Sequence, residues 1–355
     1  MSKYIFDGHK LVYHIDRVNN FLERGDCFPL YMEISIVGSC NHRCIFCAYD
    51  YIGHPNRKLE TNALLRFIDQ LSQCGVRSIL YAGEGEPLLH PDLDKFVARA
   101  AKRRIDVGMY TNGQMLKKEL SKKILPDLTF MRFSFNAGTE ADYARIHNVK
   151  PGIFGMVLKN IEDAVTLKRK DKLNLDIGLQ YVLLPENIKH LARIIKIFKD
   201  IGIDYFAIKP FVKQSKFQAY QMKKGFDLNF IKEALDEAAS FSGKNFKVIA
   251  RRDSFENYGK RNYKYCYGTS FISVLNSAGE VASCLPYWDR KDFIFGNIYE
   301  NTFKEIWLGK RRKKIKEFIT NRMEATKCPP NCRPNAVNEF LFEVKNPSVK
   351  HINFI

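Results

Sequence analysis

Short apolar runs alternate with longer amphipathic stretches between Leu30 and Pro210. The short runs are rich in β-branched and aromatic residues, and six of them have the length and composition of strands: Leu30–Val37, Ser78–Ala82, Ile105–Tyr110, Phe130–Phe135, Leu175–Val182 and Tyr205–Ile208. The intervening stretches repeat apolar residues at helical spacing, most clearly in Asn62–Gln73, Leu93–Arg103, Phe154–Lys168 and Ile188–Ile201. The pattern therefore predicts strands separated by helices.

Capping residues agree with these boundaries. Asn62 is a favourable N-cap, Pro91 suits a first helical position, and Gly75 and Gly202 stand where helices should end. Regular alternation of strand and helix predicts an α/β fold with a parallel sheet and right-handed crossovers. Six such units can curl into an open barrel or lie as a doubly wound sheet, and in such folds active sites gather at the carboxyl ends of the strands.

The pattern changes after Pro210. Residues 212–265 are basic and mixed, with one helical stretch at Phe230–Phe241. The runs Phe271–Leu275 and Glu280–Ser283 predict a hairpin with Gly279 near its turn. Residues 302–320 have the pattern of one further helix.

Length and composition exclude several classes of protein. The chain has 355 residues, 45% hydrophobic and 27% charged, which is enough apolar material for a large core and excludes a disordered chain. No apolar stretch has the length needed to cross a bilayer, and residues 1–10 lack the apolar run of a secretory signal. We therefore expect a cytoplasmic protein without a membrane partner.

The charge is strongly basic. Lys and Arg number 57 against 39 Asp and Glu, a formal net charge of +18, which raises nucleic acid, anionic membrane or a phosphorylated substrate as partners. If the cysteines described below bind metal clusters as thiolates, they would offset roughly three of these charges. The remaining basic residues are dispersed in runs such as 310–314, so we interpret them as solvated surface and do not expect nucleic acid as a partner.

The nine cysteines are grouped. In a reducing compartment, grouped cysteines indicate metal sites before disulfides. A tight trio precedes a spaced quartet, and two cysteines stand alone; the trio is Cys40, Cys44 and Cys47, the quartet is Cys266, Cys284, Cys328 and Cys332, and the single cysteines are Cys27 and Cys74.

The trio has the spacing C-x3-C-x2-C and directly follows the first predicted strand. A structural zinc site would need four ligands, and the nearest fourth candidates, His42 and His54, would give an unusual spacing. A four-iron, four-sulfur cluster held by three cysteines instead leaves one iron free to bind a substrate or cofactor. The residues alone leave both possibilities open.

The trio, with the aromatic Phe46 before its last cysteine, resembles the cluster-binding motif of radical S-adenosylmethionine (SAM) enzymes. The resemblance implies a SAM-binding 4Fe–4S cluster on these cysteines and a partial (β/α)6, TIM-like barrel. It further implies reductive cleavage of SAM to a 5′-deoxyadenosyl radical, which removes hydrogen from an unactivated carbon.

The turn after the second predicted strand carries a related motif. Residues 81–88 resemble the Gly-Gly-Glu-Pro segment of the same family, which assigns Gly83, Gly85 and Glu86 to the methionine amino group of SAM. Glu84 departs from the pattern, because many members have glycine there. The backbone atoms that face the ligand are therefore open at this position.

Polar residues also follow the third and fourth predicted strands. By the same resemblance Asn112 would contact SAM, Ser134 and Asn136 would reach its ribose, and Arg145 its carboxylate. Asn112 and Asn136 can equally cap turns.

The quartet can ligate one further iron–sulfur cluster or one zinc ion. The segments 279–284, 295–298 and 305–307 around it resemble the SPASM/twitch extensions of radical SAM enzymes. Full SPASM domains use about seven or eight cysteines for two auxiliary clusters, so four imply the single-cluster twitch form and two 4Fe–4S clusters in all. Among twitch enzymes, the spacing is close to that of 2-deoxy-scyllo-inosamine dehydrogenase, which oxidises a secondary alcohol of an aminocyclitol.

The resemblance divides the chain into five parts. It implies an N-terminal extension at 1–29, a radical SAM core at 30–212, a linking region at 213–262, a twitch/SPASM auxiliary-cluster domain at 263–340 and a C-terminal tail at 341–355. Motif likeness over this length does not transfer a substrate.

Three functions follow as hypotheses. The first is a radical SAM oxidoreductase or epimerase that oxidises or epimerises a sugar or cyclitol alcohol and takes electrons from a donor such as flavodoxin or ferredoxin. The alternative is peptide or protein modification, which we expect less because only 39 residues precede Cys40 and the quartet supports one auxiliary cluster. The third is a non-enzymatic zinc protein that binds nucleic acid.

Substrate-side residues are open. Tyr181, Lys209, Tyr287 and Arg290 stand near predicted strand ends or the hairpin and are candidates for a general base in alcohol oxidation, but for any one of them we favour a place at the surface. Cys27 precedes the first strand, and a thiol facing the barrel mouth would favour epimerisation by returning hydrogen. Cys74 is interpreted as a small core residue.

Overall fold

The computed structural model describes residues 4, 8–213, 220, 228–330 and 332–354. Its strands form one sheet in the order β10-β9-β8-β1-β2-β3-β4-β5-β6-β7. The strands are β1 Tyr31–Ile34, β2 Ser78–Tyr81, β3 Asp106–Thr111, β4 Phe130–Ser134, β5 Asp176–Leu183, β6 Tyr205–Pro210, β7 Lys247–Ala250, β8 Ile272–Leu275, β9 Glu280–Ala282 and β10 Ile294–Asn297. The pairs from β8 through β1 to β7 are parallel, and β8-β9 and β9-β10 are antiparallel.

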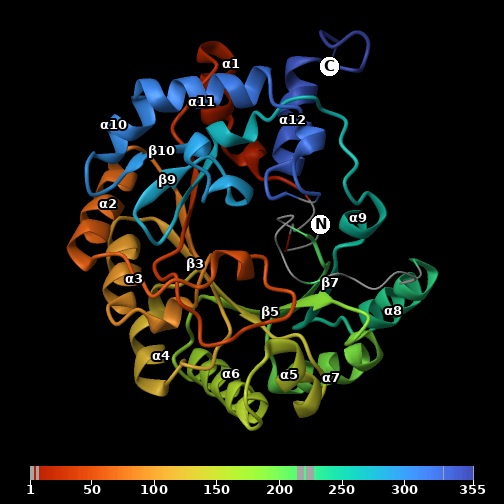
Figure 1. Cartoon of the computed structure of the whole chain (residues 1–355). Coiled ribbons are helices and arrows are strands. Elements are labelled where there is room, and N and C mark those ends of the chain that lie inside the picture. The colour runs from red at the N-terminus through yellow and green to blue at the C-terminus, as the bar shows by residue number, and fades with distance from the viewer. Residues whose placement is uncertain (1–3, 5–7, 214–219, 221–227, 331, 355) are drawn as a thin grey trace.

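Helices cover the outside of this sheet (Figure 1). The α-helices of the described chain are α1 Ile15–Arg24, α2 Thr61–Gln73, α3 Leu93–Lys102, α4 Lys118–Ile124, α5 Glu140–His147, α6 Ile153–Lys170, α7 Leu191–Ile201, α8 Leu228–Ser240, α9 Arg252–Glu256, α10 Phe303–Leu308, α11 Lys310–Asn321 and α12 Asn335–Lys345. In Figure 1, α2 to α8 follow the outer edge of the curved sheet, and the C-terminal elements close the upper side. The architecture is a mixed α/β partial barrel with a C-terminal extension.

The six predicted strands are all present, within a few residues of their expected bounds. Three helix details differ. α3 begins at Leu93 with Asp92 as its N-cap, so Pro91 lies before the helix and not at its first position. α2 begins at Thr61 with Glu60 as its N-cap, so Asn62 lies inside the helix and the prediction of its cap was wrong. The helix expected over 302–320 is two helices, because the backbone at Gly309 is extended. Glycine suits this break, since a Cβ there would lie 2.7 Å from the carbonyl oxygen of Glu305.

The sheet extends beyond the six predicted units at both edges. β7 lies inside the expected linking region 213–262 and pairs parallel with β6. At the other edge, β8 pairs parallel with β1 in the register Tyr31 with Ile272, so the C-terminal hairpin continues the barrel sheet. The strands of the expected core, linking region and auxiliary-cluster domain therefore all belong to one continuous sheet. Among the described residues, no helix combines the length and apolar character needed to span a bilayer.

Alternation along the strands separates two environments. In β4, Met131 and Phe133 are buried in the layer between sheet and helices, which is the main hydrophobic core. Arg132 points the other way, where its guanidinium donates to the hydroxyls of Tyr110 on β3 (2.7 Å) and Tyr205 on β6 (3.1 Å). Because side chains alternate with period two, the same strands build an apolar outer layer and a polar barrel interior.

A buried ion pair joins the C-terminal helices to the N-terminal segment. The guanidinium of Arg312 on α11 donates to both carboxylate oxygens of Asp26, at 2.7 and 2.9 Å, and lies 3.5 Å from the centre of the Trp307 ring. The Arg312 side chain is 1% exposed. Burial alone would raise the pKa of Asp26, but the hydrogen bonds and charge of Arg312 hold it below its usual range. Asp26 therefore stabilises the fold as a carboxylate.

We expect Asp26→Asn to lower the free energy of unfolding of the cluster-free protein by about 2–3 kcal/mol at pH 7, because it leaves a buried guanidinium without its counter-charge. A carboxyl whose pKa is lowered on folding contributes its full stability above about pH 4 and loses it as the pH falls through the lower folded-state pKa. Urea denaturation at several pH values tests this difference.

The matched control is Asp163→Asn, which removes the exposed partner of Lys159 on α6 and should change stability by less than about 0.5 kcal/mol. A difference between wild type and Asp26→Asn that persists undiminished in acid would contradict this role of the ion pair.

Candidate functional site

The three cysteines of the trio lie on the loop that follows β1. Burial raises the pKa of Cys40 to about 12, and burial together with Cys47 and Cys40 raises that of Cys44. Because Cys40 and Cys47 act electrostatically on Cys44, the three sulfurs must face a common space. Three thiolates can occupy this space only with a compensating positive charge, which a bound metal cluster provides.

Several N–H groups of the protein donate to these sulfurs. The backbone N–H of His42 lies 3.5 Å from Sγ of Cys40, and that of Tyr49 lies 3.4 Å from Sγ of Cys47. The amide Nδ2 of Asn112, after β3, lies 3.9 Å from the Cys40 sulfur. Donors directed at sulfur favour the charged thiolate form that a metal ligand requires.

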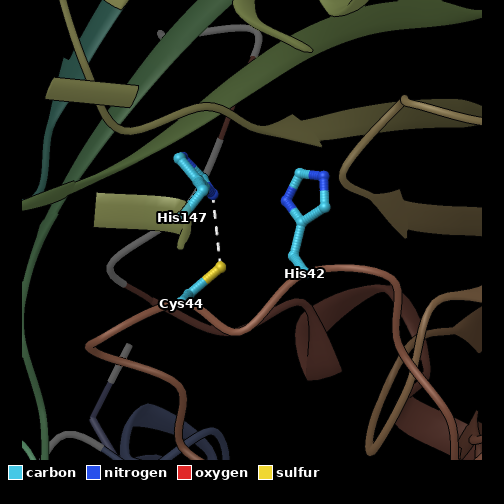
Figure 2. Close-up of side chains that lie close together, drawn as sticks. All are labelled: His42, Cys44 and His147. Carbon is cyan, nitrogen blue, oxygen red and sulfur yellow. Dashed lines mark hydrogen bonds between the residues drawn. The ribbon is translucent and has the colours of Figure 1, made fainter. Parts of the chain in front are cut away.

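His147, at the end of α5, serves the third sulfur. Its Nδ1 lies 3.2 Å from Sγ of Cys44 (Figure 2). Its Nε2 accepts a hydrogen bond from the backbone N–H of Asn136 at 3.1 Å. A backbone N–H can only donate, so Nε2 carries no proton and the neutral ring has its proton on Nδ1. Burial lowers the pKa of His147 well below its usual range, which agrees with a neutral ring. His147 therefore donates a hydrogen bond to Cys44.

His42 lies beside both Cys44 and His147 in Figure 2, with its ring centre 5.5 Å from that of His147. Its Nε2 bonds to Oε1 of Gln114 at 2.9 Å, and its Nδ1 is buried without a partner among the described residues. His42, Cys44 and His147 place one ligand atom each within 4.8 Å of one another. Within the described chain, this is the one group of three potential ligands so close together.

The spacing of the cysteine sulfurs bears on the zinc alternative. Zn–S bonds of about 2.3 Å keep the sulfurs of a single zinc site no more than about 4.6 Å apart. In the described part of the chain, neither the trio nor the quartet brings three cysteine sulfurs within 4.8 Å of one another. Both sets fit a polynuclear cluster better than one zinc ion.

The glycines after β2 are required by packing. A Cβ on Gly85 would lie 2.1 Å from the carbonyl oxygen of Ser39 and 2.5 Å from that of Val37. Gly83 has φ +127°, and its Cβ would lie 2.7 Å from Ser35. Because they lack a Cβ, the two glycines thus allow the turn to pack directly against the loop that carries the cysteine trio, in addition to leaving room for a ligand.

Glu86 follows directly in this turn and is fully buried. Its carboxylate oxygens accept hydrogen bonds from the Thr111 hydroxyl at 2.5 Å, from the backbone N–H of Asn112 at 2.7 Å and from the backbone N–H of Leu88 at 3.0 Å. Burial raises the pKa of Glu86 to about 7, against the lowering effect of these hydrogen bonds. A cationic ligand beside it would favour the charged carboxylate, as the expected SAM ammonium group would.

Glu84, the departure from the sequence pattern, has a partner far away in the sequence. Its side chain is 1% exposed and forms an ion pair with Arg57 at 3.2 Å. Its other oxygen accepts the backbone N–H of Ser277 at 3.0 Å and also the Ser277 hydroxyl. Ser277 lies in the turn between β8 and β9, so Glu84 ties the turn after β2 to the C-terminal hairpin.

The other residues expected to contact SAM lie in three different environments. Ser134 lines a cavity at the carboxyl end of β4. Asn136 is fully buried, and its Oδ1 accepts the backbone N–H of Val182 at 2.6 Å. Arg145 is half-exposed and pairs with Asp142 at 2.8 Å. Ser134 is therefore open to a ligand, Asn136 is engaged within the protein, and Arg145 is engaged at the surface.

Two adjoining cavities lie between the cysteine groups. The smaller, about 160 Å³, is lined by Phe46 of the trio loop, Ser134 and Lys209. The larger, about 530 Å³, reaches Cys332 of the quartet. Arg251 and Ser254 line both cavities. A ligand here would lie beside the trio loop at one end and the quartet at the other.

Cys266 precedes β8, Cys284 follows β9, and Cys328 and Cys332 lie in the segment before α12. Cys266, Cys328 and Cys332 each raise the pKa of at least one other cysteine of the quartet. Asn338 donates to Sγ of Cys266 at 3.3 Å, and the hydroxyl of Tyr287 lies 3.7 Å from Sγ of Cys328. Arg261 donates to the carbonyl oxygen of Cys328 at 3.2 Å. These donors suit a second group of thiolates.

The four candidate substrate residues are not gathered in one place, although the Arg290 guanidinium lies 5.5 Å from the centre of the Tyr287 ring. Lys209 lines the small cavity, whereas the hydroxyl of Tyr181 is buried and donates to the carbonyl oxygen of Asn187 at 3.0 Å. Arg290 lies at the surface near Asp292. Tyr287 lies at the quartet instead.

The position of Cys27 corrects an expectation. It precedes β1, whereas the trio follows β1, so the two lie at opposite ends of the strand. Its thiol donates to the carbonyl oxygen of Ser270 at 3.4 Å, and burial raises its pKa to about 12. Cys27 does not face the barrel mouth, which removes the argument for a hydrogen-donating thiol at this position.

Sequence reasoning missed His147, Arg251 and Arg333. His147 lies two positions after Arg145, which the family resemblance had singled out, but His147 itself belongs to no sequence motif. Arg333 directly follows Cys332, and its guanidinium reaches Glu33 on β1 at 2.9 Å. Its place beside a predicted ligand was the one available signal.

Models of known protein families match both the N-terminal and the C-terminal part of the chain. Residues 34–198 match the family model described as the radical SAM superfamily, and residues 266–333 match the SPASM model, an iron–sulfur cluster-binding domain. Together the matches cover about two thirds of the chain. The matched regions contain the trio and the quartet, so SAM, a radical SAM cluster and a SPASM auxiliary cluster are the cofactors that these residues suit.

Curated relatives are distant. The chain is 21% identical over 84% of its length to a tungsten-containing aldehyde ferredoxin oxidoreductase cofactor-modifying protein of Pyrococcus furiosus, and covers 86% of it. It is 24% identical over 78% of its length to GTP 3′,8-cyclase of Staphylococcus saprophyticus, and covers 86% of it. It is 23% identical over 49% of its length to PqqA peptide cyclase of Granulibacter bethesdensis, and covers 45% of it.

Solved structures share the fold. SuiB of Streptococcus suis bound to precursor peptide SuiA superposes with a TM-score of 0.65 at 16% identity, over 90% of this chain and 75% of that one. The enzyme anSMEcpe with bound AdoMet and Cp18Cys peptide gives 0.56 at 19% identity, over 87% and 90%. BtrN in complex with AdoMet and 2-DOIA gives a TM-score of only 0.40, at 16% identity over 83% and 88%, which is too low to indicate a shared fold.

We expect His147→Phe to lower the midpoint potential of the cluster on Cys40, Cys44 and Cys47 by on the order of 50 mV, because a hydrogen bond to sulfur stabilises the more negative, reduced state. Potentiometric titration followed by electron paramagnetic resonance measures the potential. His147→Asn, whose amide N–H can replace Nδ1–H, should restore part of it. The exposed control His351→Phe should leave it unchanged, and an unaltered potential in His147→Phe would refute the assignment.

Glu84→Ala should destabilise the protein by about 2–4 kcal/mol, because it leaves the buried N–H of Ser277 without an acceptor and removes the carboxylate that pairs with Nη2 of Arg57. Urea denaturation measures the change. Glu162→Ala, which removes an exposed and loosely paired carboxylate on α6, is the matched control. Equal stability losses in the two variants would show that Glu84 does not hold the hairpin.

Proposed function

Because the chain belongs to the radical SAM superfamily and carries a C-terminal SPASM domain, we propose that it modifies a peptide or protein by radical chemistry that begins with SAM. Relatives in sequence and fold support this class of substrate: one is named PqqA peptide cyclase, and SuiB and anSMEcpe are solved with bound peptides. Their identities are all below 25%, so they support the class and not a particular peptide.

The observation that carries the proposal is the pair of adjoining cavities between trio and quartet. The small cavity, beside Phe46, has room for a group about the size of one side chain, since an engineered cavity of about 150 Å³ accepts benzene. The larger cavity continues from Arg251 toward Cys332. An extended peptide suits this shape, with one side chain in the small cavity and neighbouring residues along the larger one.

The residues of the trio region fit the roles that the resemblance assigns. Cys40, Cys44 and Cys47 would hold the cluster, which when bound supplies the electron that cleaves SAM to a 5′-deoxyadenosyl radical. Glu86 would accept the methionine ammonium group with its buried carboxylate. Phe46 would exclude water from the cavity where hydrogen is removed.

The remaining assigned SAM contacts differ in support. Ser134 faces the cavity and can meet the ribose, and Asn112 stands beside Cys40 at the same mouth. Asn136 supports the site through its neighbours, because its backbone N–H fixes the tautomer of His147. Arg145 would have to leave Asp142 before it could contact a SAM carboxylate.

The quartet would hold one auxiliary cluster, as four cysteines suffice for a single 4Fe–4S cluster. Full ligation by protein favours electron transfer over direct binding of substrate. The electron needed to begin the reaction would come from a donor such as flavodoxin or ferredoxin.

A second candidate function is oxidation or epimerisation of a sugar or cyclitol alcohol. The quartet favours it, because its spacing is close to that of 2-deoxy-scyllo-inosamine dehydrogenase and its number matches a single auxiliary cluster. Lys209, in the small cavity, would be the general base. Epimerisation loses its candidate hydrogen donor, since Cys27 lies at the far end of β1.

Replacing Cys40, Cys44 and Cys47 together by alanine should abolish SAM cleavage to 5′-deoxyadenosine and lower the iron content from about eight to about four per chain after anaerobic reconstitution. Cys284→Ala should lower iron similarly but retain SAM cleavage. Cys74→Ala, outside both groups, is the control and should change neither. Zinc without sulfide in the wild-type protein would overturn the radical proposal.

The substrate class is tested separately by the rate of 5′-deoxyadenosine formation. Peptides encoded beside the gene and a panel of sugar and cyclitol alcohols are added to the reconstituted enzyme. Acceleration by a peptide, with a matching mass change in it, is expected. Acceleration by an alcohol alone would favour the second candidate function.

A further inference from the structure

The C-terminal helix α12 packs closely against the loop that carries Cys266. Gly268, in this loop, lies so near the start of α12 that a Cβ on it would be 2.6 Å from Cβ of Pro334. Farther along the helix, Leu341 is fully buried in a hydrophobic cluster with Phe271, which directly precedes β8. The helix is therefore anchored at its first turn and again beyond its middle.

One polar side chain of α12 lies inside this contact. Asn338 is 1% exposed, and its Oδ1 accepts hydrogen bonds from the backbone N–H groups of Tyr267 and Gly268, both at 2.7 Å. Its Nδ2 lies 3.3 Å from Sγ of Cys266. The two backbone donors fix the orientation of the amide, because a flipped amide would set N–H groups against N–H groups. Nδ2 is therefore the atom that faces the sulfur.

Two other sulfurs of the quartet have longer contacts with donors. The Tyr287 hydroxyl lies 3.7 Å from Sγ of Cys328, and the Ser283 hydroxyl lies 3.8 Å from Sγ of Cys284. A hydroxyl hydrogen can rotate away from the sulfur, whereas the amide of Asn338 is fixed by the backbone groups bound to its oxygen. Among these three donors, Asn338 thus has the shortest contact and the most constrained one.

A hydrogen bond to a cysteine ligand acts on the cluster that this ligand holds. Reduction adds one negative charge to a cluster and its sulfurs, and an N–H group directed at a ligand sulfur stabilises that charge. Hydrogen bonds to the sulfurs are accordingly among the factors that set the reduction potential of an iron–sulfur cluster. Loss of such a donor should therefore lower the potential.

We propose that Asn338 raises the reduction potential of the cluster held by the quartet, as a positioning residue that acts through Cys266. The proposal rests on the auxiliary cluster of the proposed function and not on the class of its substrate. A higher potential makes the cluster a better acceptor for one electron, which suits the electron-transfer role that full ligation by protein favours. α12 begins beyond residue 333, where the match to the SPASM model ends, so the cluster site includes a helix outside that model.

The test compares the quartet cluster of wild type with that of Asn338→Leu, which removes the donor and keeps a side chain of similar size. Both proteins are reconstituted as holoenzymes, and potentiometric titration followed by electron paramagnetic resonance measures both clusters. The signal that added SAM leaves unchanged is that of the quartet cluster. In the variant, the equilibrium of this cluster should shift about tenfold toward the oxidised form, which lowers its potential by about 59 mV. The potential of the trio cluster should stay the same.

Asn335→Leu is the matched control, because Asn335 lies one turn earlier on α12 and also has two side-chain hydrogen bonds. Its Oδ1 accepts a hydrogen bond from the Tyr263 hydroxyl at 2.7 Å, and its Nδ2 donates to Glu339 at 2.8 Å, so both bonds lead away from the sulfurs. The quartet potential should be unchanged in this variant. An equal fall in both variants would assign the effect to the packing of α12 and overturn the proposal.

A second measurement applies even where Asn338→Leu fails to assemble its cluster. The chain with alanine at the three trio positions is labelled with nitrogen-15 in its asparagine side chains, so that Asn112 beside the trio contributes no signal. Electron spin-echo envelope modulation of the reduced quartet cluster should then show coupling to a nitrogen-15 nucleus.

Absence of this coupling would overturn the proposal, as would an unshifted potential in an Asn338→Leu protein with full iron and sulfide. Both outcomes leave the radical function intact. A wild-type iron content of only about four per chain would instead refute the auxiliary cluster on which the proposal rests.

Discussion

Burial of several cysteine sulfurs close together is the constraint on which the rest of this structure depends. Buried thiols resist ionisation, as the raised pKa values of Cys40 and Cys44 indicate, and yet metal ligation requires thiolates. The fold meets this requirement with donors from separate elements: backbone N–H groups of the trio loop, the amide of Asn112 after β3 and the imidazole of His147 on α5. The barrel can therefore be understood as a frame that holds these donors at fixed distances.

The two halves of the chain are joined at the same place. The turn after β2 packs against the trio loop through Gly83 and Gly85, and Glu84 in that turn binds the hairpin between β8 and β9. Arg333 reaches from the quartet segment to Glu33 on β1. The segments that carry the two cysteine groups are thus joined by direct contacts, which suits chemistry that uses both.

The sequence predicted much of the fold because strand and helix periodicity is local information. All six core strands were found from apolar runs, and the cysteine groups from spacing alone. What could not be predicted were edges and breaks. β7 emerges from a basic region without a clear alternating pattern, and the split at Gly309 depends on close approach to the Glu305 carbonyl.

The sequence by itself determined which residues can bind metal, the order of strands and helices, and the motifs that follow β1 and β2. Tertiary structure alone decided how those residues are used. His147 is 103 residues from Cys44, and Glu84 is 193 residues from Ser277, so neither pairing leaves a trace in local pattern. Cys27 and Lys209 were equal candidates in the sequence, but the strand ends on which they lie put one away from the cavity and one inside it. The reason is physical: local propensities fix each element, whereas register and packing of the whole sheet fix which side chains meet.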